Sequence, residues 1–230
     1  MLALIVGANR GIGLGLVQEL LGRGGWDVIA TARRPEQATA LQELAASYEG
    51  RLSIEPLDID DSVQADGFAA RLGGRLLDVA LINAGVAGPE HRSAQQATRE
   101  EIGALMLTNA VASIRLGRRL LDHIRDKTGI LAFTSSVLGS IGGNDAGGHE
   151  LYRASKAALN SLTRSLSASL GERHITVLTL HPGWVRTDMG GPGAPLSVQD
   201  SVRGLADVLE RERGSGAHRF LDYAGHEVAW

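Results

Sequence analysis

The residues L-A-L-I-V-G-A-N-R-G-I-G, Leu2 to Gly13, decide the fold of this chain. Leu2 to Val6 is a short apolar run typical of a buried strand, and the apolar spacing of a helix begins directly after Gly13. A strand, a glycine turn and a helix in this order form the part of a doubly wound sheet that binds a dinucleotide pyrophosphate. Glycines let the backbone approach the phosphates, whose charge the helix N-terminus favours.

The glycine spacing limits which nucleotide site this can be. Gly7, Gly11 and Gly13 differ from the G-x-G-x-x-G pattern, and no G-K-[ST] follows them. A P-loop that hydrolyses nucleotides is therefore not indicated. A tight strand-to-helix turn without a ligand is the alternative interpretation.

Strand-like and helical patterns alternate along the rest of the chain. Further strands are expected at Asp27–Ala32, Leu52–Leu57, Asp78–Asn83, Gly129–Ser135, Ile175–Leu180 and Arg219–Asp222. Helices are expected after Gly13, at Arg33–Ala46, up to about Arg71, and at Glu100–Lys127, Leu151–Leu170 and Val198–Arg211. The alternation predicts an α/β protein, a single domain over residues 1–230 with a doubly wound Rossmann fold. Its parallel sheet should have about seven strands, with helices on both faces.

Composition excludes several classes of function. The 230 residues carry a formal net charge of -3 with acids and bases intermixed, which favours neither nucleic acid nor a membrane surface as partner. The chain has no cysteine, and its seven histidines lack the spacing of a metal site, so no metal is predicted. No apolar run is as long as a membrane span. We expect a cytoplasmic, soluble protein.

Arginines bear on which dinucleotide fits. After the second strand many NAD-binding sheets place an acid on the ribose 2′-hydroxyl, whereas this chain has Arg33 and Arg34 there. Arg10 lies inside the glycine loop, and guanidinium groups suit phosphate. NADP(H) is therefore predicted over NAD(H), with two solvated arginines as the alternative.

Polar residues follow three other strands, at the sheet edge where such folds bind ligands. Asp58 could accept a hydrogen bond from an adenine amine, and Gly85, two residues after Asn83, could let the backbone pass the cofactor. Ser136 ends the fifth strand. Asn109 lies in the middle of a helical pattern, where asparagine is a mediocre helix former. Each could instead be an ordinary turn, cap or exposed residue.

Tyr152 and Lys156 stand where a glycine-rich segment gives way to a helical pattern. As i,i+4 neighbours their Cβ atoms would be about 5–6 Å apart. A cation at about 4 Å is worth roughly three pKa units at an effective dielectric near 20. Burial opposes this, so a smaller net fall of the tyrosine pKa is expected, which suits a general acid/base. An ordinary amphipathic helix is the alternative.

The ordered motifs G-A-N-R-G-I-G, L-D-I-D-D, I-N-A-G, T-N-A, T-S-S-V-L-G, Y-R-A-S-K and H-P-G-W-V-R-T-D-M resemble the short-chain dehydrogenase/reductase family. With the closing F-L-D-Y-A-G-H-E-V-A-W, they look like its branch of carbonyl reductases that includes C-factor and Sniffer proteins. The resemblance implies that Tyr152 protonates a carbonyl oxygen and that Lys156 lowers the tyrosine pKa and holds the nicotinamide ribose. Ser136 would bond the carbonyl, and Asn109 would hold a water that relays protons.

The resemblance and the residues above together imply one cofactor-binding set. Its members are Gly7, Asn9, Arg10, Gly11, Ile12, Gly13, Arg33, Asp58, Ile59, Asn83, Ala84, Gly85, Tyr152, Lys156, Pro182, Gly183, Val185 and Thr187. The implied function is an NADPH-dependent oxidoreductase acting on an aldehyde, ketone or quinone, or on the corresponding alcohol. The alternative is a dinucleotide-sensing regulator or signalling protein with little turnover. A homodimer, or a tetramer, is implied through the two long helices.

Two departures from the family pattern affect the site. Val6 stands where the family usually has threonine, which should cost the glycine turn a side-chain bond. The segment between Ser136 and Tyr152 is longer than usual, so Ser140 is an alternative to Ser136. His149 in that segment is expected to be solvated, and the loop from Met189 to Leu196 to be the mobile part of a substrate pocket.

Overall fold

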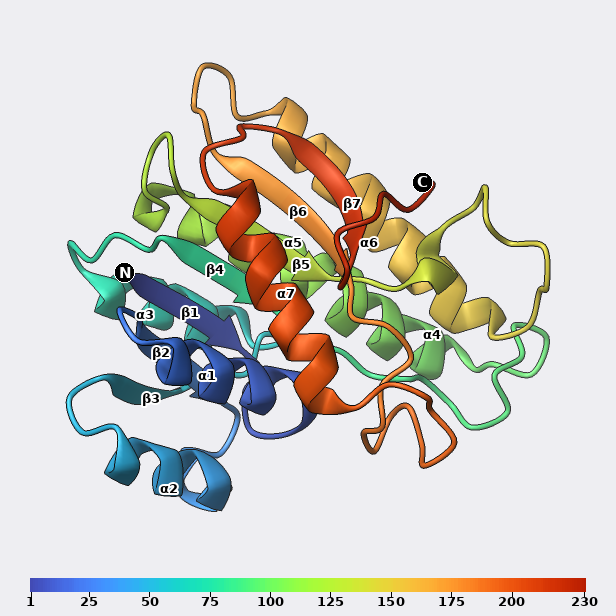
Figure 1. Cartoon of the computed structure of the whole chain (residues 1–230). Helices are drawn as coiled ribbons and strands as arrows, with labels where there is room; N and C mark the ends of the chain where they lie inside the picture. Colours follow the sequence, from blue (N-terminus) through green and yellow to red (C-terminus); the bar gives the residue numbers. More distant parts are fainter.

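The computed structural model describes residues 1–230, and its centre is a seven-stranded sheet (Figure 1). The strands run in the order β3-β2-β1-β4-β5-β6-β7, and every neighbouring pair is parallel. Their bounds are β1 Leu2–Val6, β2 Asp27–Ala32, β3 Leu52–Pro56, β4 Val79–Ile82, β5 Ile130–Thr134, β6 Thr176–His181 and β7 His218–Asp222. The predicted doubly wound parallel sheet is confirmed.

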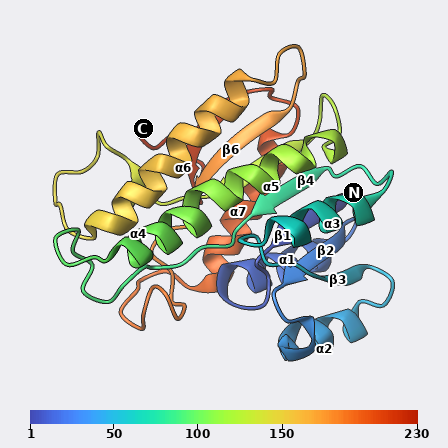
Figure 2. The same ribbon diagram turned by 180° about the vertical axis from the view of Figure 1, so that it is seen from behind.

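Helices cover both faces of the sheet, as Figures 1 and 2 show from opposite sides. They are α1 Gly11–Arg23, α2 Thr39–Ser47, α3 Ser62–Leu72, α4 Arg99–Met106, α5 Ser113–Leu120, α6 Glu150–Ala168 and α7 Val198–Glu212. Apolar residues of α1, α2 and α7 form one core cluster with the sheet, and those of α3, α5 and α6 form the other. Ala3 and Ile5 of β1 belong to the first cluster, whereas Leu4 and Val6 belong to the second. The two-residue period of the strand therefore explains its unbroken apolar run. No helix has the length and apolar character needed to cross a membrane.

The predicted helix Glu100–Lys127 is wrong in two respects. It is interrupted by a π-helical turn, η2 Leu107–Ala112, and it ends in a short 3₁₀ turn, η3 Leu121–His123. Ile124 then adopts extended dihedrals and bridges to Leu77 in parallel, with the Leu77 N–H donating to His123 O at 2.7 Å. The pairing of Ile124 with Leu77, just before β4, thus replaces the last helical turn that the sequence pattern predicts up to Lys127.

The predicted helix Arg33–Ala46 also begins later than expected. Pro35 opens a 3₁₀ turn, η1 Pro35–Gln37, and α2 starts only at Thr39. Proline favours the first helical position because its fixed φ suits it. The two arginines at the end of β2 consequently stand in a connecting segment rather than on a helix.

The strand order reverses direction between β1 and β4, so the connections that follow these two strands leave toward opposite sides of the sheet. Their carboxyl ends lie side by side, because Val6 pairs with Ile82 and the Asn83 N–H donates to Val6 O at 3.0 Å. Ligands of open α/β sheets bind in the crevice at such a switch point. The glycine loop after β1 and the I-N-A-G segment after β4 therefore meet where a site is expected.

Candidate active site

The glycine turn is packed so closely that side chains are excluded from two of its positions. Gly7 has a φ of 77°, and a Cβ there would lie 3.0 Å from the Ala84 backbone. A Cβ on Gly13 would clash with Gly7 O and would approach Asn83 Nδ2 to 2.9 Å. Asn83 Nδ2 donates to Gly7 O at 3.1 Å and so ties this turn to the end of β4. The turn is a backbone cradle at a helix N-terminus, which fits a phosphate group.

Thr31 of β2 gives the glycine turn a side-chain hydrogen bond. Its buried Oγ1 accepts a hydrogen bond from the Gly7 N–H at 3.3 Å. The turn, which has Val6 in place of a threonine, is thus supported by a hydroxyl from the neighbouring strand. No local sequence pattern indicates this bond.

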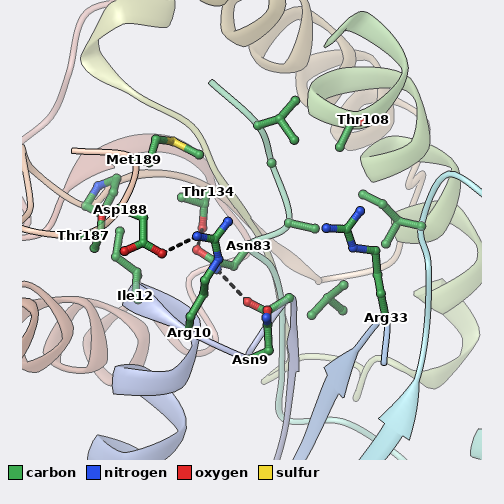
Figure 3. A pocket seen from close by; sticks show the side chains of 18 of the residues that line it. Asn9, Arg10, Ile12, Arg33, Asn83, Thr108, Thr134, Thr187, Asp188 and Met189 are labelled. Atoms are coloured by element: carbon green, nitrogen blue, oxygen red, sulfur yellow. Dashed lines mark hydrogen bonds and ion pairs between the residues drawn. The ribbon is translucent and has the colours of Figure 1, made fainter. Parts of the chain in front are cut away.

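A cleft of about 480 Å³ extends from the glycine turn along the carboxyl ends of the strands (Figure 3). A volume of this size is typical of small-molecule sites. Most residues of the predicted cofactor-binding set line it, namely Gly7, Asn9, Arg10, Gly11, Ile12, Arg33, Asp58, Ile59, Asn83, Ala84, Gly85, Tyr152, Lys156, Pro182 and Thr187.

Gly13, Gly183 and Val185 of that set are not in the lining of the cleft. Gly13 is packed inside the turn, and Val185 is buried and bridges to Leu196. Gly183 has a φ of 87°, and a Cβ on it would meet Leu196 and Tyr223. These three residues pack behind the backbone that borders the cleft, and their contact with a cofactor stays a prediction.

Arg33 and Arg34 face a second hollow of about 470 Å³ that adjoins the cleft and also includes Asn9 and Gln37. Arg33 lines both spaces, and neither of the two arginines forms an ion pair within the chain. Arg10 differs, because its guanidinium pairs with the Asp188 carboxylate across the cleft (Figure 3). The structure thus brings Arg33 and Arg34 together and sets Arg10 apart.

Tyr152 and Lys156 lie in the first turns of α6, which begins at Glu150, and Lys156 Nζ is 5.8 Å from the centre of the Tyr152 ring. Burial lowers the pKa of Lys156 to about 8. Burial also raises the pKa of Tyr152 to about 12, against a smaller lowering by a hydrogen bond with Ser136. The expected net fall of the tyrosine pKa is therefore wrong for the protein alone. Desolvation is the larger effect on the phenol, and the Lys156 ammonium donates to Thr134 O at 2.8 Å instead of to Tyr152.

The two candidate serines have different partners. Ser136 lies beside the Tyr152 phenol and lowers its pKa slightly, and its Oγ accepts from the Leu138 N–H at 3.1 Å. Ser140 Oγ accepts from the Gly143 N–H at 2.9 Å. Of the two serines, Ser136 is thus the one that acts on the phenol.

Asn109 is fully buried in the π-helical turn, a feature often found at functional sites. Its Nδ2 donates to Val86 O at 2.9 Å and to Ser155 Oγ at 3.0 Å, and its Oδ1 accepts from the Val86 N–H at 2.8 Å. A Cβ on Gly85 would lie 3.2 Å from Asn109 Oδ1 and 3.5 Å from Lys156 Nζ. Asn109 therefore fixes the segment after β4 against α6, next to the lysine.

Thr134 and Ser155 of this network were not singled out from the sequence, whereas Ser135 was expected with Ser136 at the end of the fifth strand. Thr134 accepts from Lys156 through its carbonyl and donates through Oγ1 to Asn83 Oδ1 at 3.0 Å. Ser155 receives the Asn109 amide, and Ser135 Oγ donates to Asn160 Oδ1 at 2.7 Å. Ser155 is the serine of Y-R-A-S-K, three residues after Tyr152. This spacing places it one helical turn from the tyrosine and could have identified it as a site residue.

Two partly buried histidines predict how stability depends on pH. Burial lowers the pKa of His181 and of His218 to about 4, from an unfolded value near 6.5. Because the unfolded chain binds more protons between these values, the stability contributed by the neutral rings is complete above about pH 6.5 and is lost as pH falls toward about 4. Thermal unfolding from pH 4 to 7 should show this loss, and His218→Phe should flatten it. A wild-type melting temperature that stays constant from pH 6.5 to 4 would contradict the assignment.

The chain is similar to known proteins over its whole length. The family described as short chain dehydrogenase matches residues 1–194. A carbonyl reductase of Pseudomonas aeruginosa PAO1, solved in complex with NADP, is 42% identical with a TM-score of 0.93, covering 100% of this chain and 99% of that one. Carbonyl reductase Sniffer of Drosophila melanogaster is 34% identical with a TM-score of 0.89, covering 99% and 98%. The C-signal protein of Myxococcus xanthus is 38% identical over 71% of this chain and 98% of its own length.

Proposed function

Because this chain belongs to the short-chain dehydrogenase family, we propose that it is an NADPH-dependent reductase of aldehydes, ketones or quinones. Membership makes it an oxidoreductase, and the relatives include carbonyl reductases. The observation that carries the proposal is that Tyr152 and Lys156 line a cleft that begins in the glycine cradle, with Ser136 beside the Tyr152 phenol. The Tyr152 phenol would be the acid, the Ser136 hydroxyl a hydrogen-bond donor and the Lys156 ammonium a buried cation near them.

The residues at the cleft fit a dinucleotide with a 2′-phosphate. The Gly7–Gly13 cradle and the N-terminus of α1 would hold the pyrophosphate, and Arg33 with Arg34 would hold the 2′-phosphate, since neither has an acidic partner in the chain. Lys156 would bond the ribose hydroxyls beside Gly85. When bound, NADPH would supply the hydride for the reduction. The complex of the Pseudomonas aeruginosa relative with NADP supports this choice.

Tyr152 is proposed to donate its hydroxyl proton to the carbonyl oxygen. A pKa of about 12 keeps the phenol protonated at neutral pH, which is the form needed for reduction. The Ser136 hydroxyl would donate a second hydrogen bond to the same oxygen. Lys156, with a pKa of about 8, is mostly charged at pH 7 and stabilises that phenolate. Asn109 holds this geometry through Val86 and Ser155.

A carbonyl panel tests the proposal. Loss of NADPH absorbance should accompany reduction of at least one aldehyde, ketone or quinone. The likeness to the C-signal protein favours a second candidate, a dinucleotide-sensing regulator or signalling protein. NADPH binding without turnover across a broad panel would support that candidate and contradict the first. Assembly as a homodimer or tetramer through α4, α5 and α6, and a cytoplasmic location, stay predictions.

Replacing Ser136 and Ser140 in turn tests which of the two serines hydrogen-bonds the carbonyl. Ser136→Ala should lower kcat about 10²-fold, because it removes a donor aimed at the oxygen on which charge develops. Ser140→Ala is the matched control and should keep nearly full turnover, since its hydroxyl binds only the Gly143 N–H. Steady-state rates with one carbonyl substrate decide between them. If Ser140→Ala loses activity and Ser136→Ala does not, the role belongs to Ser140.

A further inference from the structure

Residues 223–230, named here the C-terminal strap, fold back along the outer edge of β7. The Asp222 N–H donates to His226 O at 2.9 Å, and the Val228 N–H donates to Phe220 O at 2.8 Å. The Asp222 carboxylate fixes the turn by accepting from the Ala224 and His226 N–H groups, each at 2.9 Å. The strap therefore turns back at the carboxyl end of β7 and runs antiparallel along it, away from that end.

Trp230 anchors the end of the strap. Its ring packs on His218 at 4.7 Å and on the buried Phe220 at 5.4 Å between ring centres, while 41% of the residue stays exposed. His218 has no hydrogen-bond partner on either ring nitrogen, so the indole covers a ring that is otherwise held only by packing. Such tilted aromatic contacts favour one position of Trp230 and of its backbone.

The anchored backbone of Trp230 contacts the segment that joins Ser136 to Tyr152. The Gly142 N–H donates to Trp230 O at 3.0 Å, and a Cβ on Gly142 would lie 3.8 Å from Ala229 Cβ. The segment therefore lies in van der Waals contact with the strap. Figure 1 shows the red strap running up to the yellow segment before α6.

Few other hydrogen bonds hold the segment that joins Ser136 to Tyr152. At its start the Asn160 amide donates to Gly139 O at 3.1 Å, and near its end Arg153 Nε donates to Gly147 O and Gly148 O. Between them the only backbone hydrogen bond to another part of the chain is the one from Gly142 to Trp230. Ile141, the neighbour of Gly142, is 79% exposed beside this contact.

We propose that Trp230 is a positioning residue for the carbonyl substrate. Through the hydrogen bond to Gly142 it holds the segment that joins Ser136 to Tyr152, which would border the substrate beside Tyr152. The proposal rests on the proposed function, because the segment matters for substrate only if reduction occurs at Tyr152. The glycine cradle and the arginines lie on other elements, so cofactor binding does not depend on the strap.

The test compares Trp230→Ala with the conservative Trp230→Phe in the full chain. In Trp230→Ala the KM of the carbonyl should rise about fivefold to tenfold, the scale of one lost hydrogen bond. The Kd of NADPH should not change, and amide hydrogen exchange at Gly142 should become faster. Trp230→Phe should restore both KM and exchange, because a ring again packs on His218 and Phe220.

A second variant tests the same hydrogen bond without changing the packing of the C-terminal strap. Gly142→Pro removes the N–H donor while leaving Trp230 in place, and it should raise KM by a similar factor. An unchanged KM in Trp230→Ala or Gly142→Pro, or a parallel loss of NADPH affinity, would overturn the positioning role alone. Absence of turnover in the wild-type protein with every carbonyl would instead overturn the proposed function and this role together.

Discussion

Replacing Tyr152 with phenylalanine is expected to slow carbonyl reduction at least about 10³-fold, near the upper end of what a general acid contributes. The variant keeps the ring and its packing on α6 and loses only the hydroxyl that donates the proton. The Kd of NADPH should stay close to that of the wild type, because the glycine cradle and the arginines are untouched. Turnover by NADPH absorbance and binding by fluorescence titration measure the two quantities separately.

Tyr48→Phe is the matched control for this change. Tyr48 follows α2, lies outside the cleft and packs near Arg51, so loss of its hydroxyl should leave turnover intact. A Tyr152→Phe variant that retains more than about a tenth of the wild-type rate would show that another group supplies the proton. Loss of NADPH binding in the same variant would show that its effect is on the site as a whole.

Replacing Arg33 with alanine should remove most of the preference for NADPH. Arg33 lines both the cleft and the adjoining hollow and has no acidic partner in the chain, so its guanidinium is available for a phosphate. Because a charge-assisted hydrogen bond is worth about 1.5–3 kcal/mol, the Kd of NADPH should rise about 10- to 100-fold. The Kd of NADH, which lacks the 2′-phosphate, should hardly move.

Arg115→Ala on the exposed side of α5 provides the control for loss of positive charge in general. It should leave both affinities unchanged. If Arg33→Ala weakens the binding of NADPH and NADH equally, Arg33 supports the cleft but does not bind the 2′-phosphate. NADH that binds as tightly as NADPH to the wild-type protein would remove the preference altogether.

The fold and the place of the cleft follow from features that a sequence carries locally. Strand ends are marked by Gly7, Asp58, Asn83 and Ser136, and a parallel sheet brings all such ends to one edge. The four-residue spacing of Tyr152 and Lys156 is likewise fixed once a helix begins near Glu150. These predictions needed only short-range patterns and one topological rule.

The remaining features depend on tertiary packing, which local patterns do not encode. The pKa of Tyr152 is set by how deeply the phenol is buried, and a spacing of four residues contains no information about burial. Thr31 serves the glycine turn from a neighbouring strand, and Arg10 meets Asp188 from a distant loop. The early end of the helix at His123 likewise results from pairing of Ile124 with Leu77.

The most direct test of the proposed hydride transfer follows the hydrogen that leaves the nicotinamide of NADPH. Reduction of a carbonyl with NADPH deuterated at both C4 positions of the nicotinamide should place one deuterium on the new carbinol carbon of the product. Mass spectrometry of the product from the wild-type protein reads this out. Deuterium at that carbon is the result expected if the cleft carries out hydride transfer with Tyr152 as proton donor. A product whose carbinol hydrogen comes from solvent would contradict this function.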